Sequence, residues 1–132
     1  MEAEFTPDER LYRGVLDNSI FWKANRTLST TIFKNHPKDA GISVDRQQGR
    51  SEPEAMKFAL NHLTGSIIYI LVSHCVECGT LVKHCPREDN GFFNQYHSEI
   101  HRSTDVTKLS PSQSNYLTSK AEIVHYSCTL YN

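Results

Sequence analysis

The sequence predicts a single α+β domain, built on a mostly antiparallel, twisted sheet of about five or six strands with two helices. Its 132 residues suit one domain. Short β-branched or alternating segments outnumber helical ones, and turn-forming sequences separate them. The segments follow in the order β-β-α-β-β-β-α-β, which is typical of an antiparallel sheet with both helices on one side.

Six segments have the composition of strands. Residues 1–10 are expected to be a flexible leader, and the domain to span residues 11–132. The first strand, residues 11–16, alternates apolar and polar side chains. Residues 66–74 are continuously apolar and β-branched, so we expect them at the centre of the sheet. The other expected strands are 42–45, 80–85, 95–102 and 123–131, with a short extended piece at 27–33.

Two serines mark the starts of the expected helices. Ser51 in SEPE and Ser110 in SPSQ each precede a proline by one or two positions. Each also has a Glu or Gln three residues after the serine. A serine hydroxyl there accepts a hydrogen bond from the third backbone N–H, and the Glu or Gln reaches back, which is a capping box. We therefore expect helices over residues 52–63 and about 111–121.

Charge and hydropathy exclude several classes of protein. The net charge is −1, so no global basic field attracts nucleic acid, and any such contact must be local. The N-terminus is acidic and lacks an apolar run, unlike a signal peptide. The longest apolar stretch, SIIYILVSHCV, is too short to span a bilayer. We expect a cytoplasmic protein with no membrane partner and with reduced thiols.

The segment HCVECGTLVKHC suggests a zinc site. Cys75 and Cys78 have the spacing of a zinc knuckle, and Cys85 could supply a third sulfur. A second ligand pair is harder to find, because His97 and His101 lie on an expected strand, ~13 Å apart. The alternative is that the cysteines are small buried thiols at the ends of two strands. A zinc deaminase is disfavoured because its C-x₂-C follows the H-x-E motif, whereas here it precedes it.

A second candidate site consists of polar residues in strands or at their ends. Arginine suits bidentate binding of phosphate, and histidine is the usual acid or base near neutral pH. These residue types together predict that the protein binds a nucleotide or RNA. It would either act on that ligand as a transferase or hydrolase, or bind it without catalysis. The alternative is that each residue has a structural partner of its own. The ligand-binding candidates are Arg13, Ser29, Thr30, Ser43, Asp45 and Arg46, and the catalytic candidates are His97 and Glu99.

The motif order LYRGV, RTLSTTIF, GISVDR and NQYHSEI, followed by the last helix, resembles a group of small bacterial single-domain proteins. The resemblance covers residues 11–124 and departs at Gln95, where the group often has proline. It implies a bacterial domain and no particular chemistry. Many short proteins of this kind act in toxin–antitoxin and phage-defence systems.

The chain is also similar, more distantly, to R-S-E ADP-ribosyltransferases. That similarity implies NAD as the ligand, with Arg13 on its phosphates, Ser29 and Thr30 as the second motif and Glu99 as the catalytic carboxylate. The sequence departs from the family in the short spacing from Arg13 to Ser29 and in lacking E-x-E or Q-x-E before Glu99.

A non-catalytic interaction module is the alternative function. Phe92, Phe93 and Tyr96 form an aromatic group beside a glycine. If exposed, they would make a docking surface for a protein partner. A zinc-stabilised domain is the third hypothesis.

Overall fold

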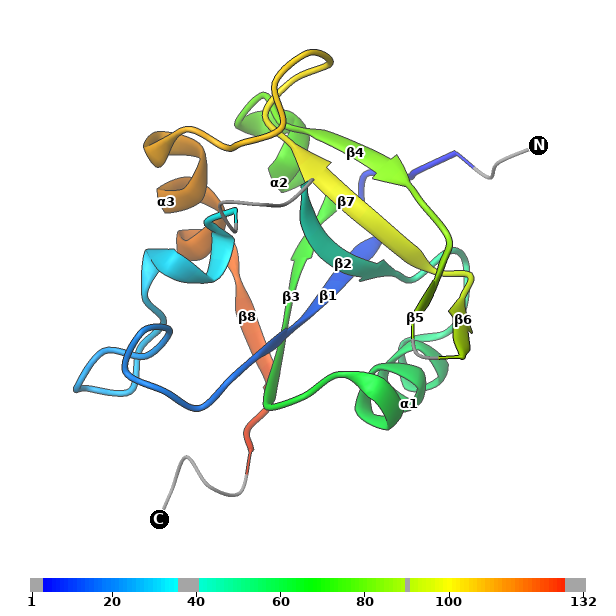
Figure 1. The fold of residues 1–132 in the computed structure, drawn as a ribbon, viewed down its shortest axis with the longest axis horizontal. Helices are drawn as coiled ribbons and strands as arrows, with labels where there is room; N and C mark the ends of the chain where they lie inside the picture. The colour runs from blue at the N-terminus through cyan, green and yellow to red at the C-terminus, as the bar shows by residue number, and fades with distance from the viewer. Residues whose placement is uncertain (1–3, 36–40, 90, 128–132) are drawn as a thin grey trace.

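The computed structural model describes residues 4–35, 41–89 and 91–127. Its main feature is a six-stranded sheet in the order β4-β7-β2-β1-β3-β8, in which every neighbouring pair is antiparallel (Figure 1). A separate hairpin pairs β5 with β6. The strands are β1 (Arg10–Val15), β2 (Ile42–Arg46), β3 (Ser66–Leu71), β4 (Leu81–His84), β5 (Arg87–Asp89), β6 (Phe92–Asn94), β7 (His97–His101) and β8 (Glu122–His125). The helices are the 3₁₀ helix η1 (Thr30–Phe33), α1 (Glu52–His62), α2 (Val72–Glu77) and α3 (Pro111–Lys120). The predicted α+β class is confirmed.

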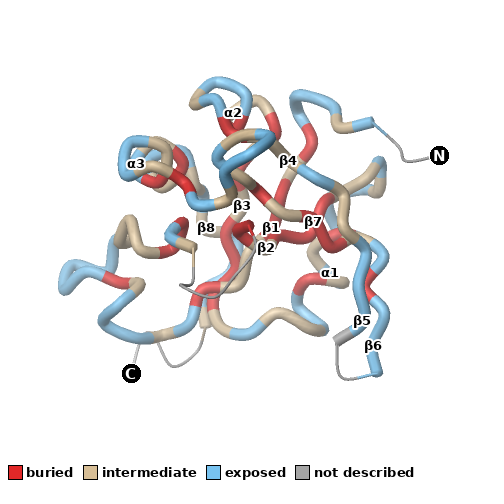
Figure 2. The backbone as a smooth tube through the Cα atoms, turned by 45° about the horizontal axis from the view of Figure 1, so that its top comes forward, coloured by how far each residue is buried: buried red, intermediate tan, exposed pale blue. Residues whose placement is uncertain are grey.

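The helices cover both faces of this sheet. On one face Tyr12 and Ile67 pack against Ala55 and Ala59 of α1. The other face carries the larger core, which includes Leu117 of α3 and residues of α2 and η1. Side chains alternate between faces along the central strands, and both sets are buried, in the two core clusters. Figure 2 shows the central strands mostly in the colour of buried residues. The expectation that both helices share one side was wrong.

Both predicted helix caps are present. The Ser51 hydroxyl accepts from the Glu54 N–H at 3.3 Å, and the Ser110 hydroxyl from the Gln113 N–H at 3.2 Å. The Gln113 side chain also accepts from the Ser110 N–H at 2.9 Å, which completes that box. The Glu54 carboxylate instead accepts from the Ser51 hydroxyl at 3.0 Å.

Three local predictions differ from the structure. The apolar run 66–74 is a strand only to Leu71 and continues as α2, a third helix, because a short apolar run fits either structure. Residues 27–33 end in η1 and not in an extended piece, since Ser29 caps that turn. The β5–β6 hairpin follows Cys85, in a stretch where the sequence predicts no strand. The other strands lie within about two residues of their predicted bounds, although residues 128–131 of the last one fall outside the described residues.

The segment expected as a leader lies against the sheet from Glu4 onward. The Val72 N–H donates to the Glu9 carbonyl at 3.0 Å, and the Ser73 N–H to the Pro7 carbonyl at 2.9 Å. These bonds satisfy the backbone at the start of α2. Within the described ranges, no helix has both the length and the apolar character needed to cross a bilayer.

Candidate functional site: a basic groove

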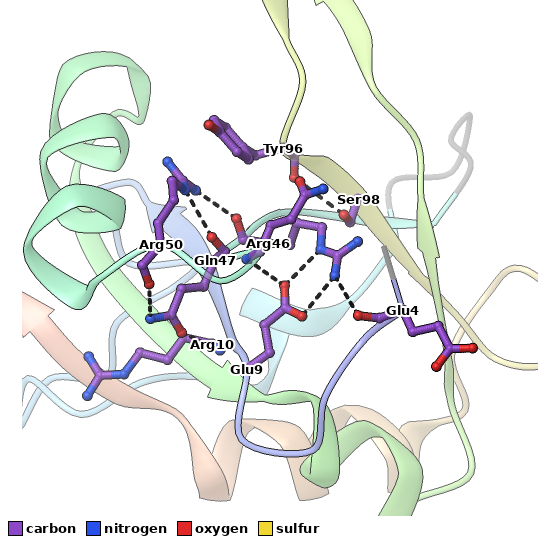
Figure 3. Close-up of polar contacts among 9 residues, drawn as sticks. Glu4, Glu9, Arg10, Arg46, Gln47, Arg50, Tyr96 and Ser98 are labelled. Carbon is purple, nitrogen blue, oxygen red and sulfur yellow. Dashed lines mark hydrogen bonds and ion pairs between the residues drawn. The ribbon is translucent and has the colours of Figure 1, made fainter. Parts of the chain in front are cut away.

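Arg46 is a completely buried structural residue. Its Nε donates to Glu9 Oε2 at 2.8 Å and its Nη2 to Glu9 Oε1 at 2.9 Å, a bidentate ion pair (Figure 3). Nη2 also donates to the Glu4 carbonyl at 3.2 Å, and the Phe5 ring lies 3.8 Å from the guanidinium carbon. The fold therefore neutralises this arginine with its own N-terminal segment, and the ion pair leaves it no role as a ligand contact.

Arg13 has different partners. Strands β1 and β2 pair only at Leu11–Arg46 and Tyr12–Asp45. Past that point the Arg13 Nη1 donates to the Ser43 carbonyl at 2.6 Å, and its Nε to the Ile32 carbonyl at 2.8 Å. Burial lowers the pKa of Arg13 to about 10, which leaves it charged at neutral pH. No carboxylate among the described residues forms an ion pair with it.

Two adjoining hollows open on this side of the molecule. The first, of about 370 Å³, is lined by residues that include Arg13, Phe21 and Lys34. The second, of about 560 Å³, is lined by residues that include Lys34, Arg102 and Lys108. They share Lys34 and its neighbour Asn35, and together are called the basic groove here. None of the described residues lining either hollow is Asp or Glu.

The cations of the second hollow have no ion-pair partner among the described residues. Lys34, Arg102 and Lys108 are exposed, and none forms an ion pair with a described residue. Their backbone is nevertheless fixed, because the Leu109 N–H donates to Asn35 Oδ1 at 2.9 Å and joins the segment of Lys34 to that of Lys108. The positive end of the α3 dipole lies beside them. The charged residues among the described lining of the groove are thus all cations, in a chain whose net charge is −1.

His97 and Glu99 belong to the opposite face of the sheet. His97 pairs with Asp45 and Glu99 with Ser43, on the face that α1 covers, whereas Arg13 alternates onto the other face. The structure therefore does not bring the two catalytic candidates together with Arg13.

The side chains of His97 and Glu99 have partners within the fold. His97 is 4% exposed, and its Nδ1 donates to the Cys85 carbonyl at 2.7 Å. Its Nε2 is buried and has no hydrogen-bond partner among the described residues. Burial alone would raise the pKa of Glu99, but hydrogen bonds from His101 at 2.9 Å and from the Gly41 N–H at 3.2 Å lower that pKa below its ordinary value.

The three hydroxyl candidates lie close to Arg13, and Ser29 has a structural role. Ser29 caps η1 by accepting from the Thr31 N–H at 3.4 Å, and Thr30 is the first residue of that turn. Ser43 lines the first hollow beside Arg13 and contributes its carbonyl to that arginine, while its side chain alternates onto the α1 face. The structure therefore places Ser29 and Thr30 in the element that holds Arg13, without directing their hydroxyls to the groove.

Asp45 is buried and forms a close pair with His62 that sequence patterns did not indicate. Its Oδ1 accepts from Asn94 at 2.8 Å, and its Oδ2 lies 2.7 Å from His62 Nε2. His62 Nδ1 lies 2.7 Å from the Phe58 carbonyl. Both ring nitrogens of His62 therefore face oxygen atoms, one from the sheet and one from its own helix. This pair joins α1 to the sheet.

The three cysteines proposed as zinc ligands do not form a ligand group. Cys75 lies in α2 and not at a strand end, and burial raises the pKa of its thiol to about 12. The Cys78 thiol donates to the Cys75 carbonyl at 3.6 Å. Cys85 follows β4, and its carbonyl holds His97. In the part of the chain that the structure describes, no three His, Cys, Asp or Glu side chains are grouped to hold a metal ion.

Of the three aromatic residues predicted as a docking surface, Phe92 and Tyr96 contact neighbouring side chains and Phe93 is the most exposed. The Phe92 ring lies 5.5 Å from His62 and 5.9 Å from Phe58. The Arg50 guanidinium lies 3.4 Å above the Tyr96 ring. Phe93 is 59% exposed at the surface of the β5–β6 hairpin.

The sequence does not mark the cations Lys34, Arg102 and Lys108 as site residues. Each is a single basic residue next to a turn or helix end, and no local pattern distinguishes it from other surface cations. The proline and serine that start α3 were the available signal, because a helix N-terminus favours anions. Comparison of the chain with protein-family models, curated proteins and solved structures found no match.

Proposed function

We propose that this protein binds a phosphate group of a nucleotide or nucleic acid in the basic groove. The observation that carries the proposal is the guanidinium of Arg13, partly buried and paired with no carboxylate of the described residues, in a hollow that also contains Lys34. A buried charge is costly unless an opposite charge compensates it. A phosphate would supply that charge, and the planar guanidinium matches its oxygens.

The composition of the groove favours binding over catalysis. Its described lining residues include no histidine, cysteine, aspartate or glutamate, the usual proton-transfer groups and nucleophiles. Arg13 and Lys34 would contact one phosphate, and Lys108 and Arg102 would attract further negative charge. NAD and nucleic acid therefore remain ligands to test, and the proposal gives His97 and Glu99 no catalytic part.

Isothermal titration calorimetry with ATP, NAD and a short single-stranded RNA at low ionic strength tests the proposal. At least one ligand should release or absorb heat on binding. Lys34→Glu should weaken that binding about tenfold, which corresponds to about 1.4 kcal/mol. Lys57→Glu is the matched control, because Lys57 is exposed on α1, on the other side of the sheet. Absence of binding to all three ligands by folded protein, or equal effects of the two variants, contradicts the proposal.

A second candidate function, binding to a protein partner, is favoured by the exposure of Phe93. Large apolar side chains in a hairpin are typical of docking surfaces. Phe92 is 42% exposed and adjoins it. Size-exclusion chromatography with light scattering tests self-association, the simplest case. A dimer that Phe93→Ser converts to a monomer would support it, and a monomer at all concentrations would argue against self-association through this hairpin.

A further inference from the structure

We infer that the ligand of the basic groove is a single-stranded nucleic acid, bound with little preference for base sequence. The inference rests on the proposed function and deepens it. Its first basis is the distribution of charge over two hollows that meet at Lys34. Ligand pockets commonly measure roughly 300–1,000 Å³, and each hollow alone is within that range. Together they offer cations to more than one phosphate, which a strand carries at every nucleotide.

Apolar side chains beside the cations supply a surface for the bases. Phe21 lines the first hollow with Ile20, which is 62% exposed. Val106, 44% exposed, lines the second with Leu109. A positively charged groove with apolar and aromatic surfaces is the arrangement that holds single strands, since every base has a face that can stack. In a duplex those faces are covered by neighbouring bases, so a duplex would lose this contact.

The uncharged polar side chains of the groove explain the low sequence preference. The Thr31 hydroxyl donates to the Ile20 carbonyl, and the Ser114 hydroxyl to the Phe33 carbonyl at 2.7 Å. The Asn35 side chain bonds to the backbone of Leu109. These side chains already form hydrogen bonds within the protein, so they are not available to bind the edges of bases. The free groups are cations, which contact phosphates and carry no sequence information.

Salt dependence gives the inference a quantitative form. For single strands the logarithm of the binding constant falls by about 0.7 per tenfold rise in salt for each phosphate neutralised. The four cations Arg13, Lys34, Arg102 and Lys108 therefore allow a slope as steep as about −3. Arg102→Ala should make the slope shallower by about 0.7. Lys57→Ala, on the α1 side, should leave it unchanged.

Fluorescence anisotropy with labelled oligothymidylate, oligouridylate and oligoadenylate, together with thymidine monophosphate and a duplex as competitors, tests the inference. We expect similar affinity for the three oligonucleotides. We expect binding about tenfold weaker for the duplex and the mononucleotide, because both lose base or phosphate contacts. Ile20→Ser, at an exposed position, should weaken oligonucleotide binding and leave mononucleotide binding less affected.

The outcomes distinguish failure of the single-strand inference from failure of the proposed phosphate binding. Equal affinity for mononucleotide and oligonucleotide overturns the single-strand inference and leaves phosphate binding standing. Preference for the duplex or for one base sequence also overturns it. If inorganic phosphate, mononucleotide and oligonucleotide all fail to bind to folded protein, the proposed function itself falls.

Discussion

Arg46 and Arg13 lie in adjacent central strands and on the same face of the sheet, yet their charges are treated in opposite ways. Arg46 is enclosed by Glu9, Glu4 and Phe5, so its charge is compensated within the chain. Arg13 donates only to the carbonyls of Ile32 and Ser43 among the described groups. The comparison shows that an arginine in a strand becomes a candidate ligand contact when the fold leaves its charge uncompensated.

The largest expected effect comes from breaking the compensated pair. Glu9→Ala leaves the buried guanidinium of Arg46 without its carboxylate, and removing one partner of a buried pair typically costs about 3–5 kcal/mol. Urea unfolding followed by circular dichroism measures the change. Glu9→Leu combined with Arg46→Met should recover much of the stability, because an apolar pair removes the buried charge.

Binding provides the control for this experiment. The folded double variant should bind the same phosphate ligand as the wild-type protein, since Arg46 does not line the basic groove. Loss of ligand binding in the folded double variant would show that the two arginines are not independent.

Substitution of the uncompensated arginine should have the reverse profile. Arg13→Met removes two hydrogen bonds but also relieves a buried charge, so the loss of stability should be about 1–2 kcal/mol, smaller than for Glu9→Ala. Phosphate binding should fall about tenfold or more, a difference of about 1.4 kcal/mol. Calorimetric titration and urea unfolding of the same preparation measure both. A large loss of stability with unchanged binding would mean that Arg13 is structural, like Arg46.

Much of the fold could be predicted from local sequence. The strand containing Arg13 followed from alternation, and the helix starts at Ser51 and Ser110 followed from capping chemistry. The strand-to-helix change after Leu71 could not be predicted, because an apolar β-branched run has no distinctive period. Tertiary contacts decide it, including the bond from the Val72 N–H to the N-terminal segment.

The site could be predicted only in part, because it depends on register between strands. The sequence predicts both Arg13 and Arg46 as phosphate contacts, and the motifs LYRG and SVDR contain nothing that distinguishes the two. The partner of Arg46, Glu9, is distant in sequence and lies in a segment expected to be flexible. Likewise, alternation within one strand could not show that His97 would face α1 while Arg13 faces α3, since that requires the strand order.

Cys75 illustrates a third way to bury an ionisable group, which is to keep it neutral. Burial raises the pKa of its thiol to about 12, above the ordinary value near 9. Between these values the unfolded chain loses the proton and the native state keeps it, so the native state becomes less stable as pH rises above about 9. The free energy of unfolding of the wild-type protein should fall relative to that of Cys75→Ala by about 1.4 kcal/mol per pH unit. Urea unfolding from pH 8 upward measures this slope, and Cys78→Ala, at the less buried end of α2, should change it less. Equal slopes for wild type and Cys75→Ala would show that the thiol ionises freely in the native state. Burial on this face of the sheet would then cost a charged group little, and the burial of Arg13 would no longer favour an anionic ligand.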